Sequence, residues 1–248
     1  MSTIEWTEKT WNPATGCTKI SPGCKFCYAA ILANRLHAMK VKGYENNFKV
    51  SLHPERLNGP LKVRKPTTWF VNSMSDLFHC DIHDSFIEQI LEVARQTPHH
   101  TYQVLTKRAE RMAYFFEDRI PPSNVWLGVT VEDKKYGLPR LEWLKLIENV
   151  SVRFLSIEPL LEDLGVVDFD GIDWVIVGGE SGVSGRKMDK AWVENVQNQC
   201  KKSAFFFKQW GMFGEDGVRK RSKKETGSLL NGEHFKAKPV VDKVFRLS

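Results

Sequence analysis

Short apolar runs that alternate with amphipathic stretches constrain the fold more than any other feature of this sequence. Six such runs are rich in β-branched and aromatic side chains, and they span residues 67–73, 101–106, 125–131, 152–157, 173–177 and 204–208. Continuous apolar strands that alternate with amphipathic helices predict a parallel sheet covered by helices. The sequence therefore predicts an α/β protein. A partial or complete (β/α) barrel of parallel strands is the first interpretation, and a doubly wound open sheet is the second.

The ends of several elements can be predicted from local residues. Residues 4–11 are expected to add a first strand before the series. Asp84 or Ser85 is expected to cap the helix after the first run, with Glu88 completing a capping box. Asp189 is expected to cap the helix that precedes the last run.

The length of 248 residues suits one large domain. We expect residues 1–210 to form the barrel and residues 211–248 to form a basic, irregular extension packed on it, with a terminal strand at 238–245. The extension contains a basic run made of Arg219, Lys220, Arg221, Lys223 and Lys224. Such a run is typical either of a solvated loop or of a surface that binds an anionic partner.

The net charge of +6 favours an anionic partner such as nucleic acid or a phosphorylated metabolite. No apolar stretch is long enough to span a bilayer. The first residues lack the basic and apolar segments of a signal peptide. A cytoplasmic protein is therefore expected.

Polar residues follow each of the six predicted strands. They lie at 73–76, 106–108, 130–133, 156–158, 179–181 and 208–210. In parallel α/β folds the chemistry takes place at the carboxyl ends of the strands. Because core packing alone does not explain six polar ends, the sequence predicts one polar pocket at this edge of the sheet.

Three of the five cysteines lie within eleven residues, at Cys17, Cys24 and Cys27, with the spacing C-x6-C-x2-C. Thiolates are soft ligands that suit iron–sulfur clusters or zinc. A structural zinc site has four ligands, whereas a cubane cluster held by three cysteines keeps one iron open for another ligand. The sequence favours a cluster. A zinc site completed by His79, Cys80 and His83, or purely structural thiols, are the alternatives.

The segment Cys24-Lys-Phe-Cys27 resembles the second half of the radical S-adenosylmethionine signature, in which an aromatic residue precedes the last cysteine. The strand ends Ser73–Asp76 and Leu105–Lys107 resemble those of the spore-photoproduct-lyase-like branch of that superfamily. Six residues separate the first two cysteines here, where the common signature has three. The sequence is also similar over nearly its whole length to an uncharacterised, phage-associated three-cysteine family. The shared motifs begin at Ile4, Thr10, Thr15, Pro22, Ser73, Leu105, Trp174 and Phe206.

These resemblances imply a radical-SAM-like partial barrel with a [4Fe-4S] cluster on Cys17, Cys24 and Cys27, and S-adenosyl-L-methionine as cofactor. Ser75 and Asp76 would contact the methionine amine, and Lys107 or Arg108 the methionine carboxylate. The candidate cofactor-binding residues are Tyr28, Ser73, Ser75, Asp76, Thr130, Glu132 and Gly179. The candidate catalytic residues are Lys107, Glu158, Glu180 and Lys208.

The sequence therefore predicts an enzyme that generates a 5′-deoxyadenosyl radical and modifies a nucleobase or nucleic acid. Its partners would include a reductant such as flavodoxin or ferredoxin. One alternative is a non-catalytic nucleic-acid-binding protein with a structural zinc or iron–sulfur site. Another is a barrel that retains the cluster without radical chemistry. Hydrolytic enzymes are disfavoured, because the sequence contains neither a nucleophile elbow nor an H-E-x-x-H motif.

Overall fold

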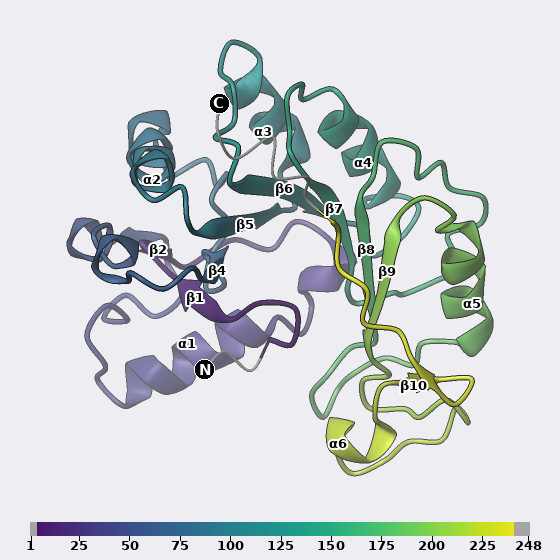
Figure 1. The fold of residues 1–248 in the computed structure, drawn as a ribbon. Coiled ribbons are helices and arrows are strands. Elements are labelled where there is room, and N and C mark those ends of the chain that lie inside the picture. Colours follow the sequence, from purple (N-terminus) through teal and green to yellow (C-terminus); the bar gives the residue numbers. More distant parts are fainter. Residues whose placement is uncertain (1–3, 241–248) are drawn as a thin grey trace.

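The computed structural model describes residues 4–240, and its centre is a seven-stranded parallel sheet (Figure 1). The strands lie side by side in chain order, and each neighbouring pair is parallel. They are β1 (Lys9–Trp11), β4 (Thr68–Val71), β5 (Thr101–Thr106), β6 (Val125–Thr130), β7 (Arg153–Ile157), β8 (Trp174–Gly178) and β9 (Ala204–Gln209). A doubly wound sheet would reverse its strand order partway, so the predicted partial barrel is confirmed and the doubly wound alternative is wrong.

The sheet curves into a half-barrel with β1 and β9 as its two edges (Figure 1). Helices cover its convex face. They are α2 (Asp84–Gln96), α3 (Ala109–Phe116), α4 (Leu138–Lys145) and α5 (Lys190–Gln199). No helix among residues 4–240 is long and apolar enough to cross a membrane.

The predicted helix caps had mixed outcomes. The Asp189 side chain accepts a hydrogen bond from Ala191 N–H at 3.0 Å, as expected for an N-cap. The prediction for α2 was wrong, because the helix begins at Asp84 after His83 and has no side-chain cap. Glu88 binds Arg95 on the helix surface at 2.7 Å instead of closing a capping box.

Aromatic side chains fill the concave face of the half-barrel below the strand ends. Trp6, Phe70, Phe154, Trp174 and Phe206 are all buried there, together with Ile176. β6 contributes a glycine at this level, because a Cβ on Gly128 would lie 2.5 Å from the Phe154 ring. Burying such rings accounts for much of the stability of a core. The lower part of the barrel interior is therefore a packed floor of side chains.

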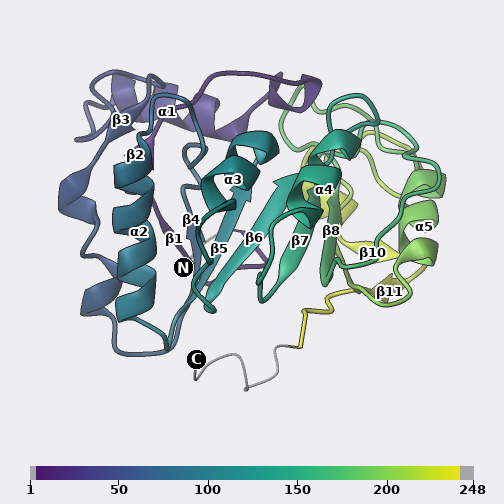
Figure 2. The same ribbon diagram turned by 90° about the horizontal axis from the view of Figure 1, so that it is seen from above.

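The cysteine segment is an excursion held at both ends by a small second sheet. β2 (Ala14–Thr15) pairs antiparallel with β3 (Ser51–Leu52), so residues 16–50 leave and rejoin the fold at one point. This excursion includes α1 (Tyr28–Ala38) and lies at the end toward which the sheet strands point (Figure 2). Gly16 has a φ of +86°, and a Cβ there would lie 2.2 Å from Lys49 O, so only glycine fits the closure.

Residues 211–240 follow the last strand of the sheet and contain α6 (Lys223–Thr226), β10 (Leu229–Leu230) and β11 (Glu233–His234). The chain then runs back along the β9 edge, where Phe207 N–H donates to Phe235 O at 2.8 Å. Trp174 Nε1 donates to Ala237 O at 2.9 Å. Residues 238–240 form no strand, and residues 241–248 of the expected terminal strand lie outside the described residues.

Candidate active site

A cavity of about 250 Å³ lies between the cysteine loop and the carboxyl ends of the sheet strands. Its lining includes Cys17, Cys24, Cys27, Tyr28, Ser73, Ser75, Asp76, Lys107, Thr130, Glu158, Gly179, Glu180 and Lys208. Every predicted site residue except Glu132 therefore faces one chamber. Below the polar rim, Trp6, Phe70 and Leu105 form an apolar floor.

The three cysteines come from one short loop that closes the top of this cavity. Cys24 ends a turn of 3-10 helix that spans Pro22–Cys24, and Cys27 directly precedes α1. Burial and then the charge of Asp76 raise the pKa of the Cys17 thiol to about 11, although Arg108 opposes both effects. At neutral pH this thiol keeps its proton until a metal displaces it.

Asp76 follows β4 and is saturated with hydrogen bonds from the protein. Its Oδ1 accepts from the Thr106 hydroxyl at 2.6 Å and from Phe78 N–H at 3.0 Å. Its Oδ2 accepts from Arg108 Nη1 at 2.9 Å and from Lys107 N–H at 3.1 Å. The carboxylate expected to contact a methionine amine thus already fixes the ends of β4 and β5 and the Arg108 side chain.

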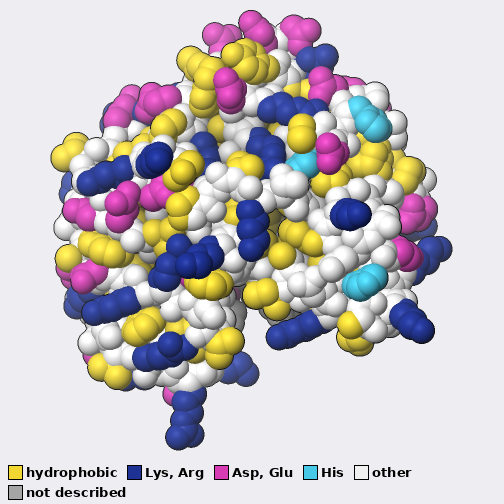
Figure 3. Space-filling view, turned by 180° about the vertical axis from the view of Figure 1, so that it is seen from behind, with side chains coloured by type: hydrophobic (Ala, Val, Ile, Leu, Met, Phe, Trp, Pro, Cys, Tyr) yellow, Lys and Arg dark blue, Asp and Glu magenta, His cyan; other side chains and the backbone are white. Residues whose placement is uncertain are grey.

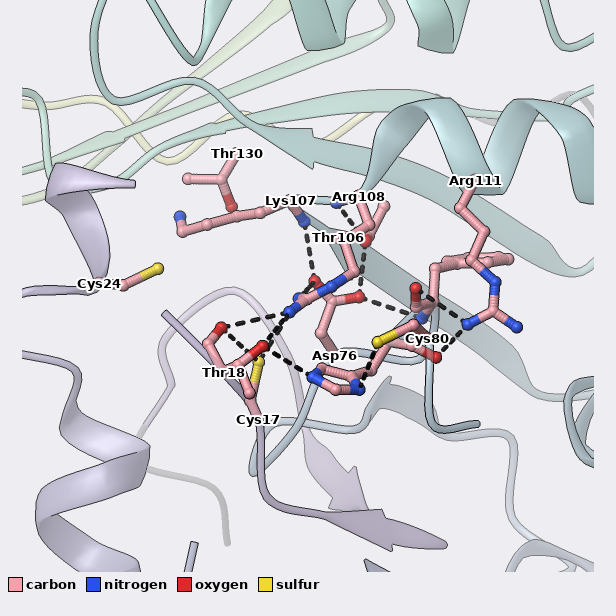
Figure 4. Close-up of polar contacts among 12 residues, drawn as sticks. Cys17, Thr18, Cys24, Asp76, Cys80, Thr106, Lys107, Arg108, Arg111 and Thr130 are labelled. Carbon is pink, nitrogen blue, oxygen red and sulfur yellow. Dashed lines mark hydrogen bonds and ion pairs between the residues drawn. The ribbon is translucent and has the colours of Figure 1, made fainter. Parts of the chain in front are cut away.

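Arg108 is the main site residue that the candidate set omitted. It directly precedes α3 and reaches back to the cysteine loop, where Nη1 lies 3.5 Å from Cys17 Sγ (Figure 4). Its Nη2 donates to Thr18 O at 3.2 Å and to the Thr18 hydroxyl at 2.9 Å. From the sequence, Arg108 was expected only as a possible partner of the methionine carboxylate. Nothing in the sequence indicates its contact with Cys17, which lies 91 positions away.

Ser73, Ser75 and Tyr28 hold the loop after β4 in place. The Tyr28 hydroxyl donates to Ser73 O at 2.6 Å, and thereby connects the start of α1 to this loop. The Ser73 hydroxyl donates to Asn12 Oδ1 at 3.1 Å, and the Ser75 hydroxyl donates to Ala14 O at 3.2 Å. The three hydroxyls therefore already have partners within the protein.

Glu132 lies behind the cysteine loop and is fully buried, so its predicted place in the cavity lining was wrong. Its carboxylate accepts from Arg140 Nη1 at 2.6 Å and from the Ser21 hydroxyl, and Lys107 Nζ lies 3.9 Å away. Burial alone would raise the pKa of Glu132, but the Lys107 and Arg140 charges lower it below its usual range. Glu132 thus anchors the loop from outside the cavity.

Lys107 and Thr130 line the wall of the cavity between the cysteines and the ends of β7, β8 and β9. The Lys107 ammonium is largely buried, and this burial lowers its pKa although the charge of Glu132 opposes the shift. A lysine of lowered pKa gives up its proton more readily than one in water. The Thr130 carbonyl accepts from Arg140 Nη1 at 2.8 Å.

The distal wall carries two ion pairs at the ends of β7, β8 and β9. Lys208 Nζ lies 3.0 Å from Glu158 Oε1, and the Ser156 hydroxyl donates to Glu158 Oε2 at 3.3 Å. Glu180 binds Arg186 at 2.6 Å. Arg186 Nη2 also donates to Pro22 O at 3.0 Å, which ties this wall to the cysteine loop.

Gly179 lies where β8 passes close to the chain that follows β9. A Cβ on Gly179 would lie 2.0 Å from Trp210 O, which no side chain can accommodate. Its backbone N–H donates to Gln209 O at 2.9 Å. The close approach of the backbone at Trp210 is therefore enough to explain why this position is glycine, whether or not a ligand also approaches it.

The residues proposed for an alternative zinc site lie outside the cavity. The ligand atoms of His79, Cys80 and Asp81 lie within 4.8 Å of one another, and His83 is not part of this group. His79 Nε2 is 2.8 Å from the Thr18 hydroxyl, and Asp81 N–H donates to His79 Nδ1 at 3.1 Å. Both His79 nitrogens therefore have protein partners, and none of His79, Cys80 and His83, which were expected to complete a zinc site, lines the cavity beside the three cysteines.

The donor set of the cavity fits a cluster with one open iron. Three thiols of one loop line the cavity, and no histidine or further cysteine joins them among the described residues of its lining. Cysteine thiolates are the usual ligands of iron–sulfur clusters. A closed zinc site would need a fourth protein ligand, and the described residues of the lining supply no further thiol or imidazole.

Comparison with known proteins agrees with this fold. The profile of a family described as "Protein of unknown function (DUF5131)" matches residues 1–239. A search of curated proteins finds no match. A solved mutant of spore photoproduct lyase is similar with a TM-score of 0.50 and 12% identity, covering 82% of this chain and 64% of the lyase. A structure of spore photoproduct lyase in complex with dinucleoside spore photoproduct has a TM-score of 0.46 and 11% identity, covering 77% of this chain and 60% of the lyase. The chain thus spans less than two thirds of these lyases, and the first similarity shows a shared half-barrel fold.

Proposed function

The chain belongs to the DUF5131 family, and we propose that it is a radical S-adenosylmethionine-type enzyme. Cys17, Cys24 and Cys27 would hold a [4Fe-4S] cluster, and S-adenosyl-L-methionine would bind in the cavity beneath them. The observation that carries this proposal is the position of the three thiols, which close the cavity with its polar rim at the carboxyl ends of the strands. A structural module has no need of such a chamber.

When bound, the reduced cluster and S-adenosylmethionine would supply a 5′-deoxyadenosyl radical, with electrons from a reductant such as flavodoxin or ferredoxin. The residues of this chain bind, orient and exclude water. Lys107 and Thr130 offer donors beside the cysteines. Glu158 and Lys208 offer charged groups to the substrate on the distal wall, whereas both oxygens of Glu180 are bound by Arg186. The aromatic floor closes the chamber from below.

Metal analysis of anaerobically purified protein tests this proposal. We expect a brown protein with iron and sulfide, and 5′-deoxyadenosine after addition of dithionite and S-adenosylmethionine. Triple replacement of Cys17, Cys24 and Cys27 by alanine should remove iron and colour. Cys200→Ala is the matched control, because this partly buried cysteine directly follows α5 and does not line the cavity. A colourless protein with stoichiometric zinc would refute the proposal.

We further propose that the substrate is a nucleobase or nucleic acid, which the net charge of +6 supports. Residues 16–50 contain six lysines and arginines and a single carboxylate, that of Glu45. Figure 3 shows the side on which the strands end, where Lys and Arg side chains flank the hollow. Contacts between such side chains and phosphates make binding dependent on salt.

Binding of single-stranded DNA and RNA, followed by fluorescence anisotropy, tests the substrate class. Triple replacement of Arg35, Lys40 and Lys42 by glutamate should weaken binding about tenfold or more and reduce its salt dependence. The same change at Lys62, Lys201 and Lys202, which precede β4 and β9 at the opposite end of the sheet, is the control. Equal effects of both triple variants would refute the proposed surface.

The main rival is a non-catalytic nucleic-acid-binding protein with a structural metal, which the compact group of His79, Cys80 and Asp81 favours. It predicts zinc that is lost in Cys80→Ala and no 5′-deoxyadenosine. A barrel that retains its cluster without radical chemistry would instead give iron and sulfide but no 5′-deoxyadenosine. The metal analysis and the product assay together separate the three cases.

A further inference from the structure

One cation lies directly against one of the three thiols. Arg108 Nη1 is 3.5 Å from Cys17 Sγ and 2.9 Å from Asp76 Oδ2, and the side chain is only 13% exposed (Figure 4). A cationic donor next to a sulfur stabilises negative charge on that sulfur. Cys24 has a different neighbour, because its Sγ lies 3.6 Å from the Ser21 hydroxyl. The loop therefore presents its cysteines in unequal environments.

The position of this guanidinium is fixed from several directions. Asp76 holds Nη1, and both oxygens of Thr18 hold Nη2. The Thr18 hydroxyl is fixed in turn by His79 Nε2 at 2.8 Å. The Arg108 backbone N–H donates to the Thr106 hydroxyl at 2.8 Å, and that hydroxyl donates to Asp76. The network thus aims the guanidinium at Cys17.

We propose that Arg108 is a positioning residue that raises the reduction potential of the cluster through its hydrogen bond to the Cys17 sulfur. This inference rests on the proposed function, because it requires a cluster on Cys17. Reduction adds one electron, and hence one negative charge, to the cluster. Hydrogen bonds to cluster sulfurs and the net charge nearby set the potential, and a buried cation stabilises the reduced form more than the oxidised form.

The contacts of Arg108 differ from those of Arg111, a nearby arginine that holds the backbone in place. Arg111 lies one turn further along α3 and also reaches the loop after β4. Its Nη2 donates to Ile82 O and, at 2.9 Å, to Asp84 Oδ1, and its Nη1 donates to the carbonyls of Phe78 and His79. All four of these acceptors are oxygens of the loop after β4 or of the start of α2, so the guanidinium of Arg111 does not donate to a cysteine sulfur. Arg111, three residues further along the chain and within the first turn of α3, is therefore the matched control for a nearby charge.

The test is a redox titration of the cluster-loaded, full-length protein, followed by electron paramagnetic resonance. In Arg108→Gln we expect the ratio of reduced to oxidised cluster at a fixed potential to fall about tenfold, which is about 59 mV for a one-electron couple. Arg108→Lys keeps the charge but not the planar fork, so its shift should be smaller. Arg111→Gln should leave the ratio unchanged.

Each outcome is decisive. An unshifted potential in Arg108→Gln, or an equal shift in Arg111→Gln, would overturn the inference. If Arg108→Gln fails to retain its cluster, Arg108→Lys decides, since an unshifted potential there together with lower thermal stability would indicate a structural role only. An unsubstituted protein that holds no iron would refute the proposed function itself, which is a different result from a loaded cluster with an unaltered potential.

Discussion

The two walls of the cavity differ in how their charged groups are used. On the proximal wall, next to the cysteines, Asp76 receives four hydrogen bonds from protein donors, and Arg108 is held by Asp76 and Thr18. On the distal wall, Glu158 and Lys208 pair mainly with each other, and both face the cavity. A saturated group fixes geometry, whereas a group with free hydrogen-bonding capacity can receive a ligand. The proximal wall thus positions the cysteine loop, whereas the Glu158–Lys208 pair of the distal wall keeps free hydrogen-bonding capacity toward the cavity.

Removing the Asp76 carboxylate should have the largest effect. Asp76→Ala leaves the largely buried Arg108 guanidinium without its partner, and breaking such a pair costs about 3–5 kcal/mol. Urea unfolding monitored by circular dichroism measures this loss. Asp84→Ala is the control, because Asp84 pairs with Arg111 at an exposed position and should cost under about 1 kcal/mol. Equal losses of unfolding free energy in Asp76→Ala and Asp84→Ala would mean that Asp76 does not hold the proximal wall more firmly than an exposed ion pair does.

Glu132 provides a second test of the proximal wall through pH. Its folded-state pKa is lowered by Lys107 and Arg140 against the opposing effect of burial, so its contribution to stability is fully present above its unfolded pKa. That contribution is lost as the pH falls from about 4.5 through the lower folded pKa. Glu132→Gln should cost about 2 kcal/mol at pH 7 and flatten the decline of unfolding free energy below pH 4.5. An unchanged slope in the variant would contradict the role of this carboxylate.

The sequence predicted the location of the site better than its internal contacts. The run at 101–106 matches β5, because β-branched and aromatic residues between polar boundaries indicate a buried strand. The carboxyl ends of parallel strands share one edge, which is why Glu158, Glu180 and Lys208 could be placed on a common rim. The order and direction of the strands are enough to predict that these residues lie on one rim.

Glu132 and Arg108 show where sequence reasoning fails. Glu132 lies two residues past the end of β6, and its side chain turns behind the cysteine loop toward Arg140 on α4 instead of into the cavity. The direction of a side chain beyond a strand depends on its tertiary partners. The same holds for Arg108, whose contact with Cys17 follows from how the loop at 16–50 folds back over β5.

The ion pair between Lys208 and Glu158 tests whether these distal side chains are held only weakly by each other. A double-mutant cycle with Lys208→Met and Glu158→Gln should give a coupling energy of about 1 kcal/mol, since the two side chains are 19% and 14% exposed. The iron content and cluster spectrum should not change. The same cycle on Lys202 and Asp170, an exposed pair at 3.2 Å, should give under about 0.5 kcal/mol. A distal variant that loses its cluster would show that the two walls are not separate in function.

Tyr28→Phe should have the smallest effect on stability. It tests whether α1 helps the proximal wall to hold the cysteine loop in place. The Tyr28 hydroxyl donates one hydrogen bond to Ser73 O, so its removal should cost about 0.5–1 kcal/mol. Yet this bond joins the start of α1, one residue after Cys27, to the loop that carries Asp76. We therefore expect release of iron to a chelator to become a few times faster, while Tyr114→Phe, an exposed tyrosine on α3, leaves it unchanged. If iron release is unaltered in Tyr28→Phe, then Asp76 and Arg108 position the loop without help from α1.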